Sequence, residues 1–489
     1  MKILLVASEA LPYCKSGGLG DFIFSYGKAL AKLGEDVSVI LPLYKSIRIK
    51  HPEVRNGFYD QFDFKRSWRT QGCGVFKVEN EGVKFYFTAR DRFDRDNRYG
   101  YGDDTERFAC FRMAVNTFIT RHNDFDVVHC NDWQTGVLPL LLSYNKKKIK
   151  TFLTIHNPAY QGWAKREDLS AFFNLDLGYY DSGYCRLGDS FNYLKTGIRS
   201  ADKINTVSKT HAQELIHDHN SFGGLGAIID WCRHYDFSGI VNGLDVDIWN
   251  PQTDSILARN YNVDNYAAGK AANKQEILRR LNWQEGFTGP LFSAITRLSS
   301  QKGVERILDL FPHLRNYGAR RIIIGTGERE DQVLAKALST PEVYLVKRYD
   351  ENLAHLLYAA SDFFLRPSHF EPCGTSQMIS ARYGTLPIVS NVGGLNDTVV
   401  DIQDGPRATG FVFQNDDYFG LVNAFYNACN LYHAHNLDSR IRRGMGIDFS
   451  WKKSAEEYLK LYHSVDWKEL LILMKKEPSR RKDGSFLCK

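Results

Sequence analysis

The chain has 489 residues, of which 43% are hydrophobic and 25% are charged, so it is an ordinary globular sequence that is too long for one hydrophobic core. Its formal net charge of +6 does not indicate a nucleic-acid-binding face, because residues 475–489 hold six Lys or Arg against two acids and so carry +4 of it. Nine scattered cysteines, no bilayer-length apolar stretch and no cleavable-signal pattern indicate a soluble, cytoplasmic protein without membrane or nucleic-acid partners.

The first predicted strand, Lys2–Ala7, precedes a helix whose apolar stripe runs from Phe22 to Leu33 and stops at Gly34. Between strand and helix lies Lys15-Ser-Gly-Gly-Leu-Gly-Asp21, where glycines allow a ligand to approach the backbone and the helix start favours an anion. This is not a Walker loop, because the lysine precedes the glycines. A surface lysine on a tight turn is the alternative.

The next segment predicts antiparallel structure. After a strand over residues 36–41, residues 73–78 and 83–87 flank Asn80-Glu-Gly82, which is a hairpin signal. Residues 90–104 are polar, aromatic and punctuated by glycine, so we expect an exposed loop. Its tyrosines, Tyr99 among them, are either solvated or available to stack on sugar rings.

Two later strands of this half end in polar residues. A helix near 105–121 leads to the strand 126–131, which ends in Asp132-Trp133, and the strand 151–155 ends in His156-Asn157. Because carboxyl ends of parallel strands share one edge of a sheet, we expect these residues to lie on the edge that also carries Lys15. Further strands are expected at 203–208 and 239–241, and the first domain at 1–250.

The second half repeats this alternation of strands and helices. After a polar connection over 252–288, strands are predicted at 291–296, 321–324, 343–346, 362–365 and 387–390, with a helical stripe over 304–314. This pattern predicts a second doubly wound parallel sheet. Arg297 and Lys302 follow its first strand, and two cations at that edge suit a diphosphate without a metal. Solvated surface charges are the alternative.

The stretch Arg366-Pro-Ser-His-Phe-Glu-Pro-Cys-Gly-Thr-Ser-Gln377 has the strongest chemical signal. It joins the strand 362–365 to a helix over 375–383, so Glu371 and Cys373 fall on a strand-to-helix loop at the carboxyl edge. The backbone amides of Gly374 and Thr375 open the helix, which favours an anion. A carboxylate beside an anion site suits a phosphate-bearing substrate whose reacting atom becomes positive. A structural turn stiffened by prolines is the alternative.

These motifs together resemble those of bacterial glycogen synthases and plant starch synthases, in register from residue 1 to about 463. The stretches that match are Lys15-Ser-Gly-Gly-Leu-Gly-Asp21, Thr154-Ile-His-Asn157, Asn242-Gly-Leu-Asp245, Arg297-Leu-Ser-Ser-Gln-Lys-Gly303, Phe370-Glu-Pro-Cys-Gly-Thr-Ser-Gln377, Tyr383-Gly-Thr-Leu-Pro-Ile388 and Gly393-Gly-Leu-Asn-Asp-Thr398.

The resemblance implies a GT-B-type α/β fold with two Rossmann-like doubly wound domains that face across a cleft. Residues 1–250 would form the acceptor-side domain and residues 251–450 the nucleotide-sugar-binding domain. Residues 451–489 would form a helix that crosses back to the first domain, followed by a basic tail. The implied activity is retaining transfer of glucose from ADP-glucose to the non-reducing end of an α-1,4-glucan, glycogen or starch, without a metal or other cofactor.

The resemblance also implies roles for residues at matching positions. Residues that would contact the donor are Lys15, Gly17, Gly18, Asn242, Tyr349 on the adenine, Cys373, Gly374 and Thr375. Residues that would take part in the chemistry are Glu371, His156, Asp132, and the diphosphate-binding Arg297 and Lys302. Trp133 and Tyr99 would line the acceptor side. No metal ligand is implied.

Some positions depart from the family pattern. Ser16 stands where threonine is usual, Gln134 replaces a histidine, Pro158 replaces an apolar residue, and Ile379 replaces a glutamate of related transferases. Gln134 and the altered loop 90–100 leave open a catalytically weak α-glucan-binding or regulatory pseudoenzyme. A glucan phosphorylase shares the architecture but needs a pyridoxal-phosphate lysine and usually a longer chain.

Overall fold

The computed structural model describes residues 1–464. The predicted basic tail lies outside these residues. No helix within 1–464 is long and apolar enough to cross a bilayer. The chain forms two compact units: unit 1 comprises Met1–Val207, Ala212–Ile240 and the described residues from Trp451, and unit 2 comprises Ser208–His211 and Val241–Ser450. Residues 241–250, which the sequence analysis assigns to the first domain, pack with unit 2, where the Leu244 amide donates to the Phe449 carbonyl.

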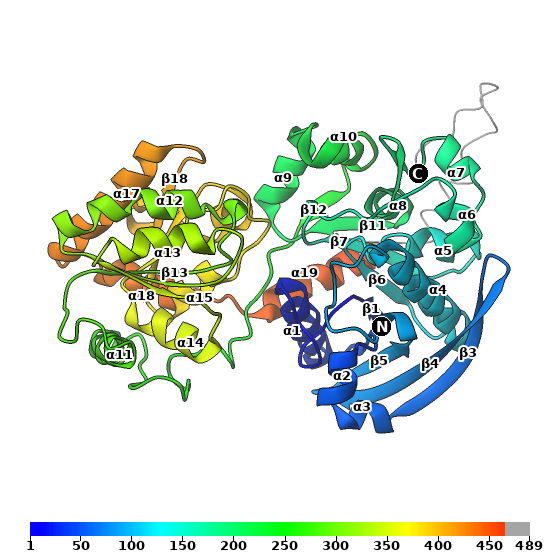
Figure 1. The fold of residues 1–489 in the computed structure, drawn as a ribbon, viewed down its shortest axis with the longest axis horizontal. Coiled ribbons are helices and arrows are strands. Elements are labelled where there is room, and N and C mark those ends of the chain that lie inside the picture. Colours follow the sequence, from blue (N-terminus) through cyan, green and yellow to red (C-terminus); the bar gives the residue numbers. More distant parts are fainter. Residues whose placement is uncertain (465–489) are drawn as a thin grey trace. The chain divides into compact units, whose positions relative to one another are not determined.

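Unit 1 is built on a nine-stranded sheet (Figure 1). In spatial order its strands are β12 (Phe237–Gly239), β11 (Lys203–Thr206), β7 (Lys150–Ile155), β6 (Val127–Asn131), β1 (Lys2–Val6), β2 (Asp36–Pro42), β5 (Val83–Ala89), β4 (Arg69–Asn80) and β3 (Phe58–Arg66). The strands from β12 to β5 are parallel, and β4 and β3 extend the sheet antiparallel. The last expected strand, 239–241, lies two residues earlier in the chain than predicted.

The hairpin predicted around Asn80-Glu-Gly82 is confirmed. Asn80 pairs with Val83, so Glu81 and Gly82 form a two-residue turn, and both have positive φ angles, 47° and 78°. This is the turn geometry that matches the twist of an antiparallel pair.

Helices flank the sheet of unit 1. They are α1 (Gly18–Lys32), α2 (Lys45–Lys50), α3 (Pro52–Asn56), α4 (Asp104–His122), α5 (Leu138–Tyr144), α6 (Asp168–Phe173), α7 (Gly178–Asp181), α8 (Tyr193–Ser200), α9 (Lys209–His217), α10 (Ser221–Arg233) and α19 (Trp451–His463). A small antiparallel sheet of β8 (Trp163–Ala164), β10 (Ser190–Asn192) and β9 (Arg186–Leu187) was not predicted. The chain runs from β1 to β2 on one side and later to β6 on the other, so the strand order reverses between β1 and β6.

Unit 2 has a parallel six-stranded sheet with helices on both faces (Figure 1). Its strands in order are β15 (Val343–Val346), β14 (Arg320–Ile324), β13 (Leu291–Ile295), β16 (Phe363–Arg366), β17 (Leu386–Ser390) and β18 (Phe411–Phe413). Its helices are α11 (Tyr266–Arg280), α12 (Val304–Asp309), α13 (Glu330–Leu338), α14 (Glu351–Ala360), α15 (Ser376–Arg382), α16 (Gly393–Thr398), α17 (Tyr418–His433) and α18 (Asp438–Gly446). Here the strand order reverses between β13 and β16.

The helix predicted over 304–314 is wrong in length. Helix α12 ends at Asp309, and two short 3₁₀ segments, Phe311–His313 and Arg315–Tyr317, follow it. Pro312 explains the interruption, because proline lacks an amide hydrogen and disfavours the α conformation at the residue before it. The apolar side chains still reach the core of unit 2.

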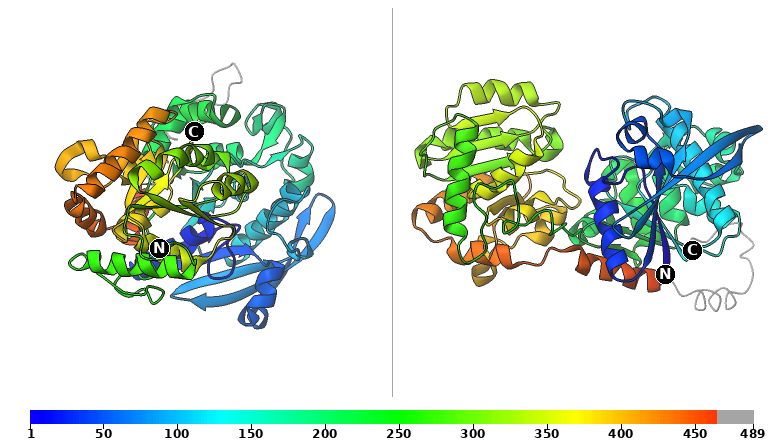
Figure 2. Two further views of the ribbon diagram at one scale, coloured as in Figure 1. Left: turned by 60° about the vertical axis from the view of Figure 1, so that its left-hand side comes forward. Right: turned by 90° about the horizontal axis from the view of Figure 1, so that it is seen from below.

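Helix α19 packs beside α1 in unit 1, as Figure 1 and the right-hand view of Figure 2 show. The contact is aromatic: Tyr26 and Phe22 of α1 lie 4.6 and 6.0 Å from the ring of Tyr458, and Trp451 packs against both. The last described helix therefore completes the core that the first helix begins.

A buried hydrogen-bond network ties α19 to three strands of the sheet. The Tyr462 hydroxyl accepts from Tyr26 (2.7 Å) and lies 2.6 Å from Nδ1 of His129, whose Nε2 lies 2.6 Å from Oγ1 of Thr154. The Thr154 hydroxyl donates to Asn205 at 2.8 Å, so His129 must donate to Thr154 from Nε2 and accept from Tyr462 at Nδ1. Burial lowers the pKa of His129 to about 3, which keeps it neutral in this role.

We expect Tyr462→Phe to destabilise unit 1 by about 1–3 kcal/mol, because it leaves His129 Nδ1 and the Tyr26 hydroxyl without partners in a buried site. The measurement is denaturant unfolding followed by tryptophan fluorescence. Tyr235→Phe, at a residue that is 98% exposed, is the matched control and should change the midpoint little. Equal midpoints for the two variants would show that the network contributes nothing.

Candidate functional site

The site residues predicted from the sequence fall into two groups, one at the carboxyl edge of each parallel sheet. In unit 1 these residues are Lys15, Gly17, Gly18, Tyr99, Asp132, Trp133 and His156. In unit 2 they are Asn242, Arg297, Lys302, Tyr349, Glu371, Cys373, Gly374 and Thr375. Each edge includes the point at which strand order reverses, where parallel sheets leave a crevice for ligands.

A buried carboxylate, that of Glu9, holds the glycine-rich loop of unit 1 in place. Glu9 is 2% exposed and accepts from the amide and the hydroxyl of Ser16 at 2.7 and 2.6 Å. Gly17 then caps α1, and the Lys15 ammonium lies 2.8 Å from Asp21 at the surface. Burial raises the pKa of Glu9 even though these hydrogen bonds and Arg98 oppose the effect.

The prediction that residues 90–104 form an exposed loop is wrong in part. Phe93 is fully buried, and the guanidinium of Arg107, also fully buried, lies 5.2 Å from its ring and donates to the Arg98 carbonyl. Tyr99 is half-buried, with its hydroxyl 2.7 Å from Oγ of Ser8 and its ring stacked on Phe108. The loop is thus anchored to the core, and a role for Tyr99 in acceptor binding stays a prediction.

Arg98 connects this loop to the glycine-rich loop. It donates to the Lys15 carbonyl, and its Nε lies 3.9 Å from Glu9. The guanidinium of Arg98 and the carboxylate of Glu9 therefore constrain the adjacent residues Lys15 and Ser16 at the start of the glycine-rich loop.

Asp132 follows β6 in a left-handed backbone conformation with φ 57°. Its Oδ1 accepts from the amides of His156 (2.7 Å) and Asn157 (3.3 Å), which joins the ends of β6 and β7. Burial raises the pKa of Asp132 to about 7, and the charge of Glu9 adds to this effect. This side chain can therefore exchange a proton near neutral pH.

His156 is held as a neutral imidazole. Its Nε2 lies 2.9 Å from Oδ1 of Asn131, whose Nδ2 donates to the carbonyls of Val6 and His129, so Nε2 of His156 must carry the hydrogen. Burial lowers the pKa of His156 to about 3. Its remaining nitrogen, Nδ1, is thus an acceptor and not a cation at neutral pH.

Trp133 offers little surface to a ligand. It is 9% exposed, its ring lies 5.4 Å from Phe108, and a Cβ at Gly162 would come within 2.4 Å of it. Its carbonyl accepts from Arg112 at 2.9 Å. A role in acceptor binding stays a prediction for this residue.

In unit 2, Glu371 lies in a buried cluster with two cations. Lys302 Nζ is 2.9 Å from both carboxylate oxygens, Arg366 Nε is 2.8 Å from Oε2, and Ser368 donates to Oε2 at 3.1 Å. All four residues are at most 9% exposed. Burial raises the pKa of Glu371, but Arg366 and Lys302 outweigh it and hold the pKa at about 2. Burial lowers the pKa of Lys302 to about 8, against the opposing effect of Glu371.

Two glycines allow this cluster to close. A Cβ at Gly303, where φ is 66°, would lie 1.9 Å from the Pro367 carbonyl oxygen, and one at Gly393 would lie 2.0 Å from the Glu371 carbonyl oxygen. The Lys302 turn and the start of α16 can approach the 366–371 loop only without side chains there.

The remaining predicted residues of unit 2 lie along the same edge. Arg297 is exposed just after β13 and close enough to lower the pKa of Lys302, and Tyr349, 56% exposed, follows β15 two strands away. Two strand spacings place these ends about 10 Å apart. Cys373 is buried beside the backbone of Asn242, and its pKa is raised to about 12, so its thiol is not a nucleophile. Gly374 (φ 67°) and Thr375 lead into α15.

The sequence analysis missed three charged residues at these edges: Glu9, Arg98 and Arg366. Glu9 and Arg366 carry the signal that identified Asp132 and His156, because each is a charged residue at the carboxyl end of an apolar strand. Arg98 has no such signal, since its loop position is determined by Arg107 of a neighbouring helix.

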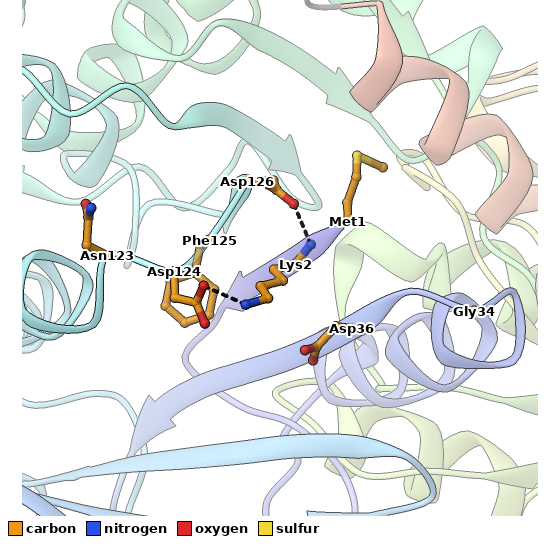
Figure 3. A pocket seen from close by; sticks show the side chains of 8 residues that line it. All are labelled: Met1, Lys2, Gly34, Asp36, Asn123, Asp124, Phe125 and Asp126. Carbon is orange, nitrogen blue, oxygen red and sulfur yellow. Dashed lines mark hydrogen bonds and ion pairs between the residues drawn. The ribbon is translucent and has the colours of Figure 1, made fainter.

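A hollow of about 470 Å³ lies at the opposite edge of the unit 1 sheet (Figure 3). It surrounds Lys2 and Asp36, the first residues of β1 and β2. The Lys2 ammonium donates to Asp124 at 2.6 Å, and the Lys2 backbone amide donates to Asp126 at 2.8 Å. Because the hollow faces the amino ends of the strands, it does not include the predicted site residues.

Comparisons with known proteins identify the family of this chain. The family model "Starch synthase catalytic domain" matches residues 2–230, and "Glycosyl transferases group 1" matches residues 275–437. The chain is 38% identical to a glycogen synthase of Lactobacillus acidophilus over 477 residues, which cover 94% of this chain and 99% of that protein.

Two solved structures are also similar. The catalytic domain of starch synthase IV from Arabidopsis thaliana, bound to ADP and acarbose, superposes with a TM-score of 0.84 at 32% identity, over 95% of this chain and 99% of that one. Sucrose-phosphate synthase from Thermosynechococcus elongatus (TM-score 0.60, 15% identity, 96% and 99% covered) shares the fold. The expected fold class, a two-domain α/β fold of the GT-B type, is thereby confirmed. The chain belongs to the glycogen and starch synthase family of glycosyltransferases.

Proposed function

We propose that this protein transfers glucose from ADP-glucose to the non-reducing end of an α-1,4-glucan, with retention of configuration. The observation that carries the proposal is the buried cluster of Lys302, Arg366 and Glu371 beside the exposed Arg297. It lies at the strand-order reversal of unit 2, in a chain that aligns over 95% of its length with a starch synthase solved with ADP and acarbose.

The charges at this edge suit departure of a nucleoside diphosphate. Two cations and one carboxylate leave the buried cluster with a net charge of +1, and Arg297 adds a second positive charge at the surface. As the bond between C1 of glucose and the diphosphate breaks, negative charge grows on the leaving oxygen, which preorganised cations stabilise. The acceptor hydroxyl forms the new bond to C1 on the same face and passes its proton to that oxygen.

Glu371 stabilises the positive charge that develops on the sugar, and its low pKa keeps it ionised across the physiological range. The unit 1 edge contributes groups of another kind: Lys15 as a cation, neutral His156 as an acceptor, and Asp132 as a group that titrates near neutrality. Tyr349, Asn242 and the backbone of Gly17, Gly18, Gly374 and Thr375 bind the donor. No observation on residues 1–464 favours the pseudoenzyme alternative.

The direct test is an initial-rate measurement of glucose incorporation into glycogen with ADP-glucose and with UDP-glucose as donors. We expect ADP-glucose to be used with the higher kcat/KM. A preference for UDP-glucose would change the donor assignment, and no incorporation from either donor would contradict the proposed function.

Arg297→Ala and Lys302→Ala should each lower kcat by on the order of 10²-fold, the loss typical of a removed preorganised donor. They should differ in stability. Arg297 is exposed, so its removal leaves unfolding unchanged, whereas removal of buried Lys302 weakens the pairing of Glu371. Thermal unfolding of both variants, run beside the kinetic assay, separates the two effects. A loss of activity in Arg297→Ala that follows a loss of stability would contradict its assignment.

Asp132→Asn should change how stability depends on pH. The unfolded-state pKa of Asp132 is near 3.8 and the folded-state value is about 7, so the folded protein binds more protons between them. The contribution of Asp132 to the free energy of unfolding is therefore fully present below about pH 4 and is lost as pH rises through about 7. Asparagine retains an oxygen for the amides of His156 and Asn157 but does not titrate.

We expect the thermal midpoint of Asp132→Asn to rise relative to the parent protein as pH increases from about 5 to about 8. Asp96→Asn, at a side chain that is 83% exposed, is the control. Parallel pH curves for the parent protein and Asp132→Asn would contradict the raised pKa.

A further inference from the structure

Arg366 contacts the same carboxylate as Lys302 but is anchored in a different way. In addition to its bond to Glu371, it donates from Nη1 to Oγ1 of Thr296 (2.9 Å) and to the carbonyl of Ile295 (3.4 Å). It is also the last residue of β16, with its backbone in register with Val389 of β17. Arg366 therefore spans the strand-order reversal between β13 and β16 and is held in place even without Glu371.

Lys302 is held much more loosely. It ends a three-residue 3₁₀ segment, Ser300–Lys302, and among residues 1–464 its ammonium hydrogen-bonds to no side chain except Glu371. An ammonium on a four-carbon stem can reorient at little cost, whereas a planar guanidinium with three partners cannot. Of the two cations, Lys302 is the one that can turn toward an added anion.

A carboxylate buried to this degree cannot lose its partner without a large penalty. If Lys302 turns toward a diphosphate, Glu371 still has the Arg366 guanidinium at 2.8 Å and the Ser368 hydroxyl at 3.1 Å. Without Arg366, the same movement would leave Glu371 with a hydroxyl alone, so either Lys302 would stay on Glu371 or Glu371 would take up a proton.

We propose that Arg366 is a positioning residue that keeps Glu371 ionised and oriented while Lys302 shifts from Glu371 to the diphosphate of the donor. This inference rests on the proposed function, because it takes a nucleoside diphosphate as the anion that recruits Lys302. It assigns the two buried cations different tasks: Lys302 serves the substrate, and Arg366 serves the carboxylate.

The groups that face Glu371 determine its response to pH. They are Lys302, Arg366 and the Ser368 hydroxyl, with the neutral thiol of Cys373 nearby and Arg297 acting through Lys302. Arg366 is the larger of the two electrostatic effects that lower the pKa of Glu371. Its loss would raise that pKa and move protonation of Glu371 toward the working pH.

The experiment compares Arg366→Met, Arg366→Lys and Arg306→Met with the parent protein. Arg306 is the matched control: it is equally buried and holds the same loop through the Pro367 carbonyl (3.3 Å) and Asn415 (2.9 Å), but it does not touch Glu371. One readout is ADP affinity by titration calorimetry, which needs no turnover. The other is the pH dependence of kcat with ADP-glucose and glycogen.

We expect Arg366→Met to weaken ADP binding by on the order of tenfold or more, because Lys302 is then retained by Glu371 and the cluster loses its net positive charge. The acid limb of its kcat profile should move to higher pH. Arg366→Lys restores the charge but not the three-partner anchoring, so it should recover most of the shift in the acid limb and only part of the ADP affinity. Arg306→Met should lower the thermal midpoint but leave ADP affinity and the acid limb unchanged.

The second part of the experiment uses Glu371→Gln, because this change removes the negative charge that Arg366 is inferred to stabilise. In that background Arg366→Met should no longer shift the pH profile, which is the non-additivity expected of directly coupled groups. Arg366→Met that behaves like Arg306→Met in both readouts, or that keeps its pH shift in the Glu371→Gln background, would overturn the inference. A parent protein that neither binds ADP nor uses ADP-glucose would instead overturn the proposed function.

Discussion

The polarity of parallel strands is the constraint on which both candidate edges depend. In a parallel sheet every strand ends on the same side, and where the strand order reverses, the loops from neighbouring strands diverge and leave room for a ligand. The reversal lies between β1 and β6 in unit 1 and between β13 and β16 in unit 2. Residues as far apart in sequence as Lys302 and Glu371 therefore meet at 2.9 Å.

The pKa values of the buried carboxyl groups are shifted in opposite directions at the two edges. In unit 1, Glu9 and Asp132 have too little positive charge around them, so burial dominates and raises both pKa values. In unit 2, Glu371 faces two cations, and its pKa falls to about 2. The unit 1 edge thus offers one carboxyl group, that of Asp132, that can carry a proton near neutral pH, and the unit 2 edge offers a net positive charge. Both kinds of environment can serve the transfer of a sugar from a diphosphate to a hydroxyl.

Local patterns predicted the features that local forces determine. Short apolar runs identified most strands of both sheets, although the edge strand β18 (Phe411–Phe413) was missed. The Glu81-Gly82 turn followed from the glycine and its neighbour. The break after Asp309 was also predictable, because Pro312 is a local signal that the apolar stripe obscured. Burial of the loop around Phe93 was not, since it depends on Arg107 reaching across from α4. The pairing of Arg366 with Glu371 likewise requires the folded loop, because residues five apart on an irregular segment have no fixed distance.

The position of α19 has a consequence for how the protein is made. Unit 2 is almost continuous in the chain, whereas the core of unit 1 is completed only by Trp451–His463. On the ribosome, α1 and β6 emerge hundreds of residues before the helix that covers Phe22, Tyr26 and His129. The nascent first unit therefore has an uncovered aromatic surface until Trp451–His463 has been synthesised, and chaperones bind such surfaces during synthesis.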